Sequence, residues 1–326
     1  VFKSKKDLNY FFKVFFIVFN ISLFFGIVDF YFSFTDLGFI SRHLHEHLAG
    51  EPIMVGPRFH GFAGEPRDAF VFLALGLALY YVKSIFQGRP QNAYYYLVII
   101  VCMLLTFSAS SYVGIMIFFG LYLITITANN LKKSFIYFLL SPLILITLYI
   151  FIMEIPVLIF GENNNRLALY FDTLITIVDI YKTKNIPPFI VGQMSNIDPI
   201  FWIVDNLYKY NPLPLIFGGG FGSASHVNNM LAGWNDISSN NPHANIIRVI
   251  SETGLIGLYV YIISFYKPVS RQAKQLLNNN EYSLLIVFLL FILSASLAHR
   301  TSSVFIFVGI TYSYLNILRY EKIILK

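Results

Sequence analysis

The sequence has few charged residues and almost no cysteine. Only 12 % of its residues are Asp, Glu, Lys or Arg, and Cys102 is its single cysteine. An ordinary soluble domain is about one quarter charged, and one thiol cannot form a disulfide within the chain. These two absences exclude a typical soluble domain and a disulfide scaffold, whereas 56 % hydrophobic residues and a mean hydropathy of +0.65 indicate a membrane protein.

Charge is also scarce inside the apolar stretches. Ionisable residues within membrane spans usually mark ion pathways or proton relays. Here Asp29, Asp68 and Lys83 lie near the ends of apolar segments, where they can reach the membrane surface. The pattern therefore disfavours an ion-coupled transporter.

The long apolar segments predict an all-α polytopic membrane bundle. A spanning helix needs about 20 mostly apolar residues. Eight segments fit: 11–32, 68–86, 93–110, 111–128, 135–153, 250–268, 283–298 and 302–318. The predicted organisation is spans one to five in 1–153 with a first outer loop at 33–67, a large helical extracytoplasmic loop at 154–244, and spans six to eight in 245–326. We expect the third and fourth spans to form a tight hairpin at 108–111, and further sequence upstream of Val1.

The distribution of charge predicts the orientation. With the N-terminus in the cytoplasm, most Lys and Arg fall in short inside loops and tails, as the positive-inside rule requires, and most Asp and Glu fall outside. Both ends of the chain are then cytoplasmic. The net charge of +6 reflects this topology and does not indicate nucleic-acid binding.

The segment just before the second span combines arginines with flexible backbone. Arg58 and Arg67 flank Gly61, which permits tight turns. A guanidinium binds a phosphate or diphosphate with two parallel hydrogen bonds. Two interpretations stay open: an anion site, or a turn whose arginines contact lipid headgroups or pair with Glu65 and Asp68.

A histidine cluster in the first outer loop raises the question of a metal site. His43 and His47 are four residues apart and share a face if the segment is helical. The zinc-protease pattern needs His-Glu-x-x-His, which Glu46 does not provide. A solvated interfacial segment is favoured, and no metal is predicted.

The second outer loop contains an arginine at a predicted helix start. Asn163–Asn165 favours a turn and helix cap, and 167–180 repeats apolar residues at helical spacing. A cation is unfavourable near a helix N-terminus, so Arg166 requires an anionic partner. That partner is either Asp172 or a phosphate of a ligand.

The same loop ends in a glycine run and a histidine. Gly218–Gly220 is either a phosphate cradle or a tight backbone turn, and it lacks the context of a nucleotide fingerprint. His243 follows Pro242 at the mouth of the sixth span, where an imidazole can accept a proton near pH 7; a structural histidine is the alternative. His226 and His299 are weaker candidates of the same type.

Taken in order, these motifs resemble the O-antigen ligase/polymerase superfamily. The resemblance covers nearly the whole chain and is carried by Arg58-x-x-Gly61, Arg166 with its amphipathic helix, Leu215–Gly222, Pro242–Asn245 and Glu252–Leu258. It implies a metal-independent, cofactor-free membrane glycosyltransferase in the bacterial cytoplasmic (inner) membrane. The donor is a polyprenyl-diphosphate-linked glycan, and an acceptor sugar hydroxyl attacks its anomeric carbon.

The resemblance also implies residue roles. Arg58 and Arg166 offset charge on the departing diphosphate, and His243 takes the hydroxyl proton. Substrate-binding candidates are Arg67, Glu65, Gly61, Gly220, His226 and Asn245. The sequence departs from the family pattern at Thr106–Ala109, where an arginine is missing, at Pro66-Arg67, where Pro-Asn is usual, and at His243–Asn245, where a His-Asn pair is stretched by one residue.

The leading functional hypothesis is polymerisation of surface-polysaccharide repeat units such as O-antigen or capsule. A ligase that transfers glycan to a lipid A core or another acceptor shares the chemistry. A transporter or flippase of lipid-linked oligosaccharide is the alternative from a different class. Expected partners are the lipid-linked donor, a saccharide acceptor and the bilayer, with a chain-length regulator or flippase as a further partner and no nucleic acid.

Overall fold

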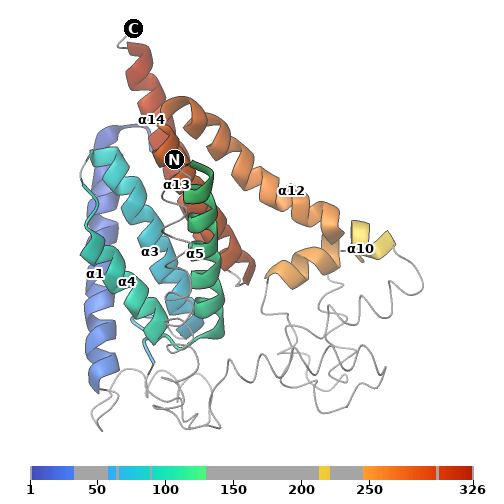
Figure 1. The fold of residues 1–326 in the computed structure, drawn as a ribbon, viewed down its shortest axis with the longest axis horizontal. Helices are drawn as coiled ribbons and strands as arrows, with labels where there is room; N and C mark the ends of the chain where they lie inside the picture. The colour runs from blue at the N-terminus through green and yellow to red at the C-terminus, as the bar shows by residue number, and fades with distance from the viewer. Residues whose placement is uncertain are drawn as a thin grey trace. The chain divides into compact units, whose positions relative to one another are not determined.

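The computed structural model describes residues 2–32, 58–63, 66–88, 90–129, 213–220, 245–298 and 301–324. Within these residues every regular element is a helix, which confirms the all-α prediction for this part of the chain (Figure 1). The helices are α1 (Lys5–Phe32), α3 (Pro66–Gln87), α4 (Ala93–Leu105), α5 (Ala109–Asn129), α10 (Leu213–Phe217), α12 (Asn245–Leu276), α13 (Asn279–Ala298) and α14 (Ser303–Ile324). The predicted fifth span and most of both outer loops lie outside the described residues.

Four of the described helices are long and apolar enough to cross a membrane, by length and composition: α1, α3, α12 and α13. The apolar helix α4 has 13 residues, about 20 Å at 1.5 Å per residue, and the apolar stretch of α5 is similarly short. The structure therefore supports a helical protein with several candidate spans, and the count of eight stays a prediction.

The connection between α4 and α5 lies earlier than predicted. Helix α4 ends at Leu105, and α5 already begins at Ala109, so the turn is Thr106–Ser108 instead of 108–111. Phe107 adopts a left-handed φ of 45°, which a helix cannot continue through. The Thr106 hydroxyl donates to the Met103 carbonyl at 2.7 Å, and the Ser111 amide donates to the Ser108 carbonyl at 2.9 Å. These bonds close a tight helical hairpin, as expected, at a shifted position.

The chain divides into two compact units, and each is described by itself. The first comprises Val1–Thr173, Val269–Ala295 and Ser303–Lys326, and the second comprises Leu174–Pro268 and Ser296–Ser302. In the first unit α3 contacts α1, α4, α5 and α14, and most of its side chains are buried. Helix α3 is therefore the central helix of this unit (Figure 1).

Glycines let aromatic rings approach the helices of the first unit closely. A Cβ at Gly76 would lie 2.0 Å from the Phe19 ring, and one at Gly114 would lie 2.2 Å from the Phe70 ring. Small residues at such contacts are the usual means of close helix packing in membranes. The abundant phenylalanines thus form the interhelical core of this unit.

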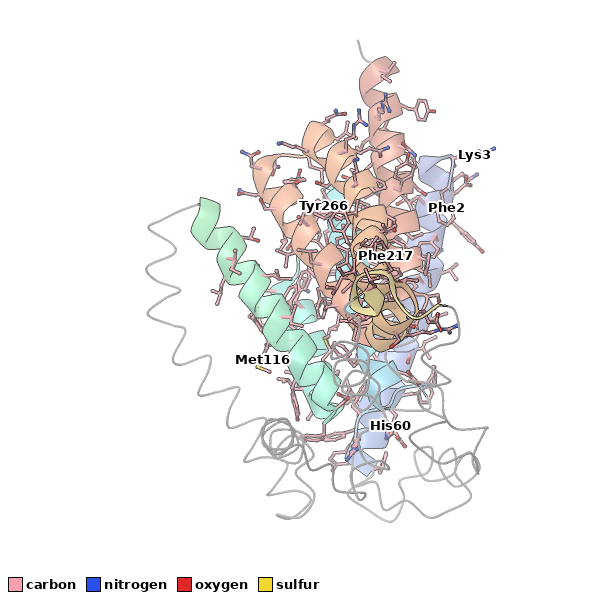
Figure 2. The ribbon with its side chains drawn as sticks, turned by 90° about the vertical axis from the view of Figure 1, so that its right-hand side faces the viewer. Phe2, Lys3, His60, Met116, Phe217 and Tyr266 are labelled. Atoms are coloured by element: carbon pink, nitrogen blue, oxygen red, sulfur yellow. The ribbon has the colours of Figure 1, made fainter. Side chains whose placement is uncertain are left out.

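The first unit has two chemically different ends. The start of α1 meets the ends of α3 and α14: Lys5 Nζ lies 3.5 Å from the Glu321 carboxylate, and the Gln87 amide donates to Asn9 Oδ1 at 3.1 Å. We call this the Lys5 end. The opposite end carries the segment 58–63 and the α4–α5 turn, and we call it the Arg58 end; Figure 2 labels Phe2 and Lys3 at the former and His60 at the latter. Helix α1 therefore runs antiparallel to α3 and α14.

In the second unit the first part of α12 is divided by a glycine. Gly254 has φ 66° and ψ −168°, so the chain forms a short helix before it and a long helix after it. The predicted sixth span, 250–268, therefore starts inside the short helix and crosses a break. Its mouth lies beside α10 and the glycine run.

Candidate functional site

Some of the predicted site residues lie within the described part of the chain, and others lie outside it. Arg58 and Gly61 lie in the first unit at the Arg58 end, and Arg67 lies in the first turn of α3. Gly220 and Asn245 lie in the second unit. Outside the described residues are His243, Arg166, Glu65 and His226, so their roles stay predictions.

Backbone hydrogen bonds fix the Arg58 segment against two helices. The Phe59 amide donates to the Leu105 carbonyl at the end of α4 at 2.9 Å. The Phe62 amide donates to Ser22 Oγ on α1 at 3.3 Å. Since both bonds involve the main chain, they fix the course of the segment and hence the starting point of the Arg58 side chain.

Close glycine contacts complete this attachment. Gly61 has φ +58°, which favours glycine. A Cβ at Gly26 of α1 would lie 2.5 Å from the Phe59 ring and 2.9 Å from Gly61 Cα. The space lined by Phe59, His60, Gly61 and the facing residues of α1 and α3 is too tight for a water molecule. Gly61 therefore acts here through backbone packing, and its substrate-binding role stays a prediction.

Arg58 lies in a poorly hydrated environment. Its residue is half-buried and its Nε is fully buried. Tyr112, in the first turn of α5, is 2 % exposed, and its hydroxyl lies close enough to Arg58 to feel the guanidinium charge. His60, two residues on, is also buried. The Arg58 end therefore combines a cation and a phenol where water screens charges weakly.

The glycine run forms a backbone junction with α12. The Gly219 amide donates to the Ser251 carbonyl at 2.7 Å, and the Gly220 amide donates to the Glu252 carbonyl at 3.2 Å. Gly218 and Gly220 have φ values of 82° and 92°. Because both amides already donate to carbonyls, they cannot cradle a phosphate while these bonds hold. The geometry is that of the tight-turn interpretation, and substrate binding by Gly220 stays a prediction.

Two motifs distant in the sequence meet at this junction. A Cβ at Gly218 would lie 2.3 Å from the Glu252 carbonyl group, and one at Gly254 would lie 2.2 Å from the Ile216 carbonyl oxygen. Neither position has room for a side chain, and both have positive φ. The glycines of Phe217–Gly220 and of Glu252–Gly254 are thus two halves of one contact that sets the entry into the long part of α12.

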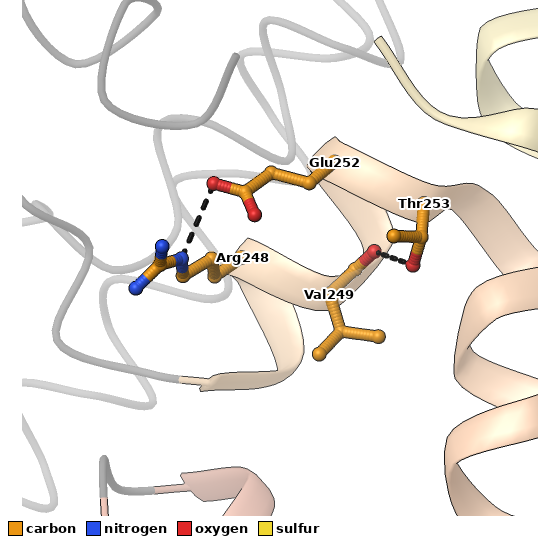
Figure 3. Close-up of polar contacts among 4 residues, drawn as sticks. All are labelled: Arg248, Val249, Glu252 and Thr253. Atoms are coloured by element: carbon orange, nitrogen blue, oxygen red, sulfur yellow. Dashed lines mark hydrogen bonds and ion pairs between the residues drawn. The ribbon is translucent and has the colours of Figure 1, made fainter. Parts of the chain in front are cut away.

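An ion pair lies beside the junction. Arg248 Nε is 3.2 Å from Glu252 Oε1, and the Glu252 side chain is 7 % exposed whereas that of Arg248 is 50 % exposed (Figure 3). The Thr253 hydroxyl donates to the Val249 carbonyl at 2.7 Å in the same turn. Asn245, a predicted substrate-binding residue, donates through Nδ2 to the Ser296 carbonyl at 2.9 Å. The side chain of Asn245 therefore has a structural partner here.

The sequence analysis did not single out Arg248 or Tyr112, and it named Glu252 only as the first residue of the Glu252–Leu258 motif. The i, i+4 spacing of Arg248 and Glu252 is a usable sequence signal for a helical ion pair. Tyr112 carries no such signal, because it stands at the start of an apolar run and only the tertiary structure brings it near Arg58.

Comparisons with protein-family models, with curated proteins and with solved structures find no match for this chain. The functional argument therefore rests on the residues and on their arrangement at the Arg58 end and at the glycine junction.

Proposed function

We propose that this protein is a metal-independent membrane glycosyltransferase that polymerises surface-polysaccharide repeat units. In this proposal the chain crosses the bacterial cytoplasmic membrane eight times, and the Arg58 end faces outward. The donor is a polyprenyl-diphosphate-linked glycan. The observation that carries the proposal is Arg58 itself, a half-buried guanidinium on a backbone segment fixed to α1 and α4.

A fixed arginine at the end of an apolar bundle suits a lipid-linked diphosphate. The lipid tail of such a donor lies in the bilayer, which brings its diphosphate to the depth where the helices end. Guanidinium has five N–H donors in a planar fork and binds phosphate oxygens in pairs. Donors positioned in advance in a poorly hydrated site stabilise charge more strongly than the same donors in water.

The proposed reaction needs a cation and a base. The acceptor hydroxyl oxygen forms a bond to the anomeric carbon while the bond from that carbon to the diphosphate oxygen breaks. The leaving polyprenyl diphosphate keeps the electron pair, and Arg58 and Arg166 offset its charge. His243 accepts the hydroxyl proton. The glycine junction supports this scheme because it holds Ser251 and Glu252 of the short helix that begins two residues after His243.

Conservative replacement of Arg58 tests the proposal. Arg58→Lys keeps the charge but loses the paired hydrogen bonds, so we expect transfer to fall about tenfold or more, and Arg58→Ala to fall further. Glycan transfer from a polyprenyl-diphosphate-linked repeat unit is measured with purified protein in lipid nanodiscs. Arg319→Lys, at an exposed arginine on α14, is the matched control and should keep full activity. Equal rates for all variants would contradict the proposal.

A ligase uses the same donor and the same residues, so it is the second candidate. The glycan that accumulates on the polyprenyl lipid in a deletion strain distinguishes the two. Loss of a polymerase leaves single repeat units, whereas loss of a ligase leaves long lipid-linked chains. A flippase, in contrast, would move the lipid-linked glycan across vesicle membranes without forming any glycosidic bond.

A further inference from the structure

Tyr112 is a buried tyrosine whose hydroxyl has no hydrogen-bond partner among the residues that the structure describes. The residue is 2 % exposed, and its hydroxyl oxygen is fully buried. Buried polar groups are almost always hydrogen-bonded, because an unpaired one loses its water without compensation. Phenylalanine would fill the same space without that cost. The Tyr112 hydroxyl is therefore suited to form a hydrogen bond with a ligand.

Three other tyrosines of the same unit have hydroxyls that are hydrogen-bonded to protein groups. The Tyr81 hydroxyl donates to the Glu281 carbonyl at 3.0 Å, and the Tyr282 and Ser270 hydroxyls share a hydrogen bond of 2.9 Å. The Tyr95 hydroxyl donates to Asn20 Oδ1. Among the described residues the Tyr96 hydroxyl shares with Tyr112 the lack of such a bond, so Tyr112 is distinguished by combining an unpaired hydroxyl with a position close to Arg58.

Hydrogen bonds attach the neighbours of Arg58 and of Tyr112 to the same α4–α5 connection. The amide of Phe59, next to Arg58, donates to the carbonyl of Leu105 at 2.9 Å. The adjacent Thr106 shares a hydrogen bond with Ser111, which precedes Tyr112. The Thr106 and Ser111 hydroxyls therefore bond to each other, and the Tyr112 hydroxyl takes no part in these bonds.

We infer that Tyr112 and Arg58 form one anion site, in which the Tyr112 hydroxyl donates to a phosphate oxygen of a lipid-linked diphosphate held by Arg58. The inference rests on the proposed function, which supplies the ligand, and it adds a substrate-positioning residue that the sequence motifs do not contain. A hydrogen bond to a charged oxygen is shorter and stronger than one between neutral groups. A phenol also adds a donor without adding a second positive charge, so the leaving diphosphate is oriented without being held by another cation.

Binding of farnesyl diphosphate to purified protein in zwitterionic nanodiscs tests the inference. A hydrogen bond to a charged group corresponds to roughly a tenfold to hundredfold change in affinity, so Tyr112→Phe should weaken binding by about tenfold or more in calorimetric titration. Tyr96→Phe is the matched control: Tyr96 also has a buried hydroxyl without a hydrogen-bond partner in the described part of the chain, but it packs on Tyr80 with ring centroids 5.1 Å apart and lies nearer the other end of α4, away from Arg58. Its binding should equal that of the wild type.

The comparison with Arg58→Ala separates the two proposals. Unchanged binding by Tyr112→Phe with weakened binding by Arg58→Ala overturns the inference and leaves the proposed function intact. Unchanged binding by both variants overturns the inference together with the proposed role of Arg58. Nanodiscs of phosphatidylglycerol add a third arm: if they abolish the binding of farnesyl diphosphate to the wild type, a lipid headgroup is the occupant and the inference is wrong.

Thermal unfolding without ligand excludes a purely structural role. Because an unsatisfied hydroxyl destabilises the empty site, Tyr112→Phe should unfold at the same temperature as the wild type or higher. Lower stability together with weaker binding would show that the hydroxyl supports the fold, and this result would overturn the inference.

Discussion

Gly26 on α1 shows how one missing side chain positions Arg58. A Cβ there would lie 2.5 Å from the Phe59 ring and 2.9 Å from Gly61 Cα, and the second of these is backbone that cannot rotate away. Overpacking of this kind costs about 1–3 kcal/mol. We expect Gly26→Ala to lower the unfolding temperature in detergent and to reduce glycan transfer, because it displaces the segment that carries Arg58.

The control for this prediction is Gly120→Ala on α5. Among the described residues outside its own helix backbone, no atom lies within 4 Å of a Cβ at Gly120, so the change in stability should be about 0.5 kcal/mol or less. If Gly26→Ala is as stable and as active as Gly120→Ala, the close contact does not position Arg58.

At this residue scale the charged member of the proposed Arg58–Tyr112 site is easier to recognise in the sequence than the neutral one. Arg58 stands out in the sequence because a cation beside flexible backbone is unusual in an apolar chain. Tyr112 does not, since the chain has 22 tyrosines and only the tertiary structure buries this one and brings it close to Arg58. Burial is a property of the tertiary contact and has no local signature.

Hydropathy predicts which segments of the chain form helices, but it does not predict where all of these helices end or break. The ends of α1, α3 and α13 agree with the predicted apolar segments to within about six residues. The end of α4 does not agree, because the apolar run continues past Leu105 while Phe107 takes a left-handed conformation. The break at Gly254 was also missed, since it requires Gly218 to approach from 36 residues earlier in the chain.

The break in α12 gives a prediction at the scale of the element. Gly254, with φ 66° and ψ −168°, occupies a region that is nearly restricted to glycine and costs other residues about 1–3 kcal/mol. Gly254→Ala would also place its Cβ 2.2 Å from the Ile216 carbonyl oxygen. We expect this variant to separate the glycine run from α12, with lower thermal stability and with loss of glycan transfer.

Gly309→Ala on α14 is the control for that prediction, because a Cβ there would meet no neighbour within 4 Å in the described part of the chain beyond its own helix backbone. Its stability and activity should be close to those of the wild type. A Gly254→Ala protein that keeps wild-type stability would mean that the junction does not depend on the glycine.

At the scale of the whole molecule, the helices of the first unit alternate in direction, as the predicted topology requires. Lys5 meets Glu321 at one end, whereas Phe59 meets the end of α4 at the other. Successive spans with this alternation expose one end of the unit on each side of a membrane. Which end faces the cytoplasm stays a prediction from the positive-inside rule.

Cysteine labelling in intact cells tests that orientation. Phe62 is 55 % exposed at the Arg58 end, and Lys3 is exposed at the Lys5 end. Phe62→Cys should react with a membrane-impermeant maleimide in intact cells, whereas Lys3→Cys should react only after the cells are permeabilised. The wild type is the control, because its single thiol, Cys102, is buried. The reverse pattern would place Arg58 in the cytoplasm, on the side opposite to the exported glycan, and would exclude both the polymerase and the ligase.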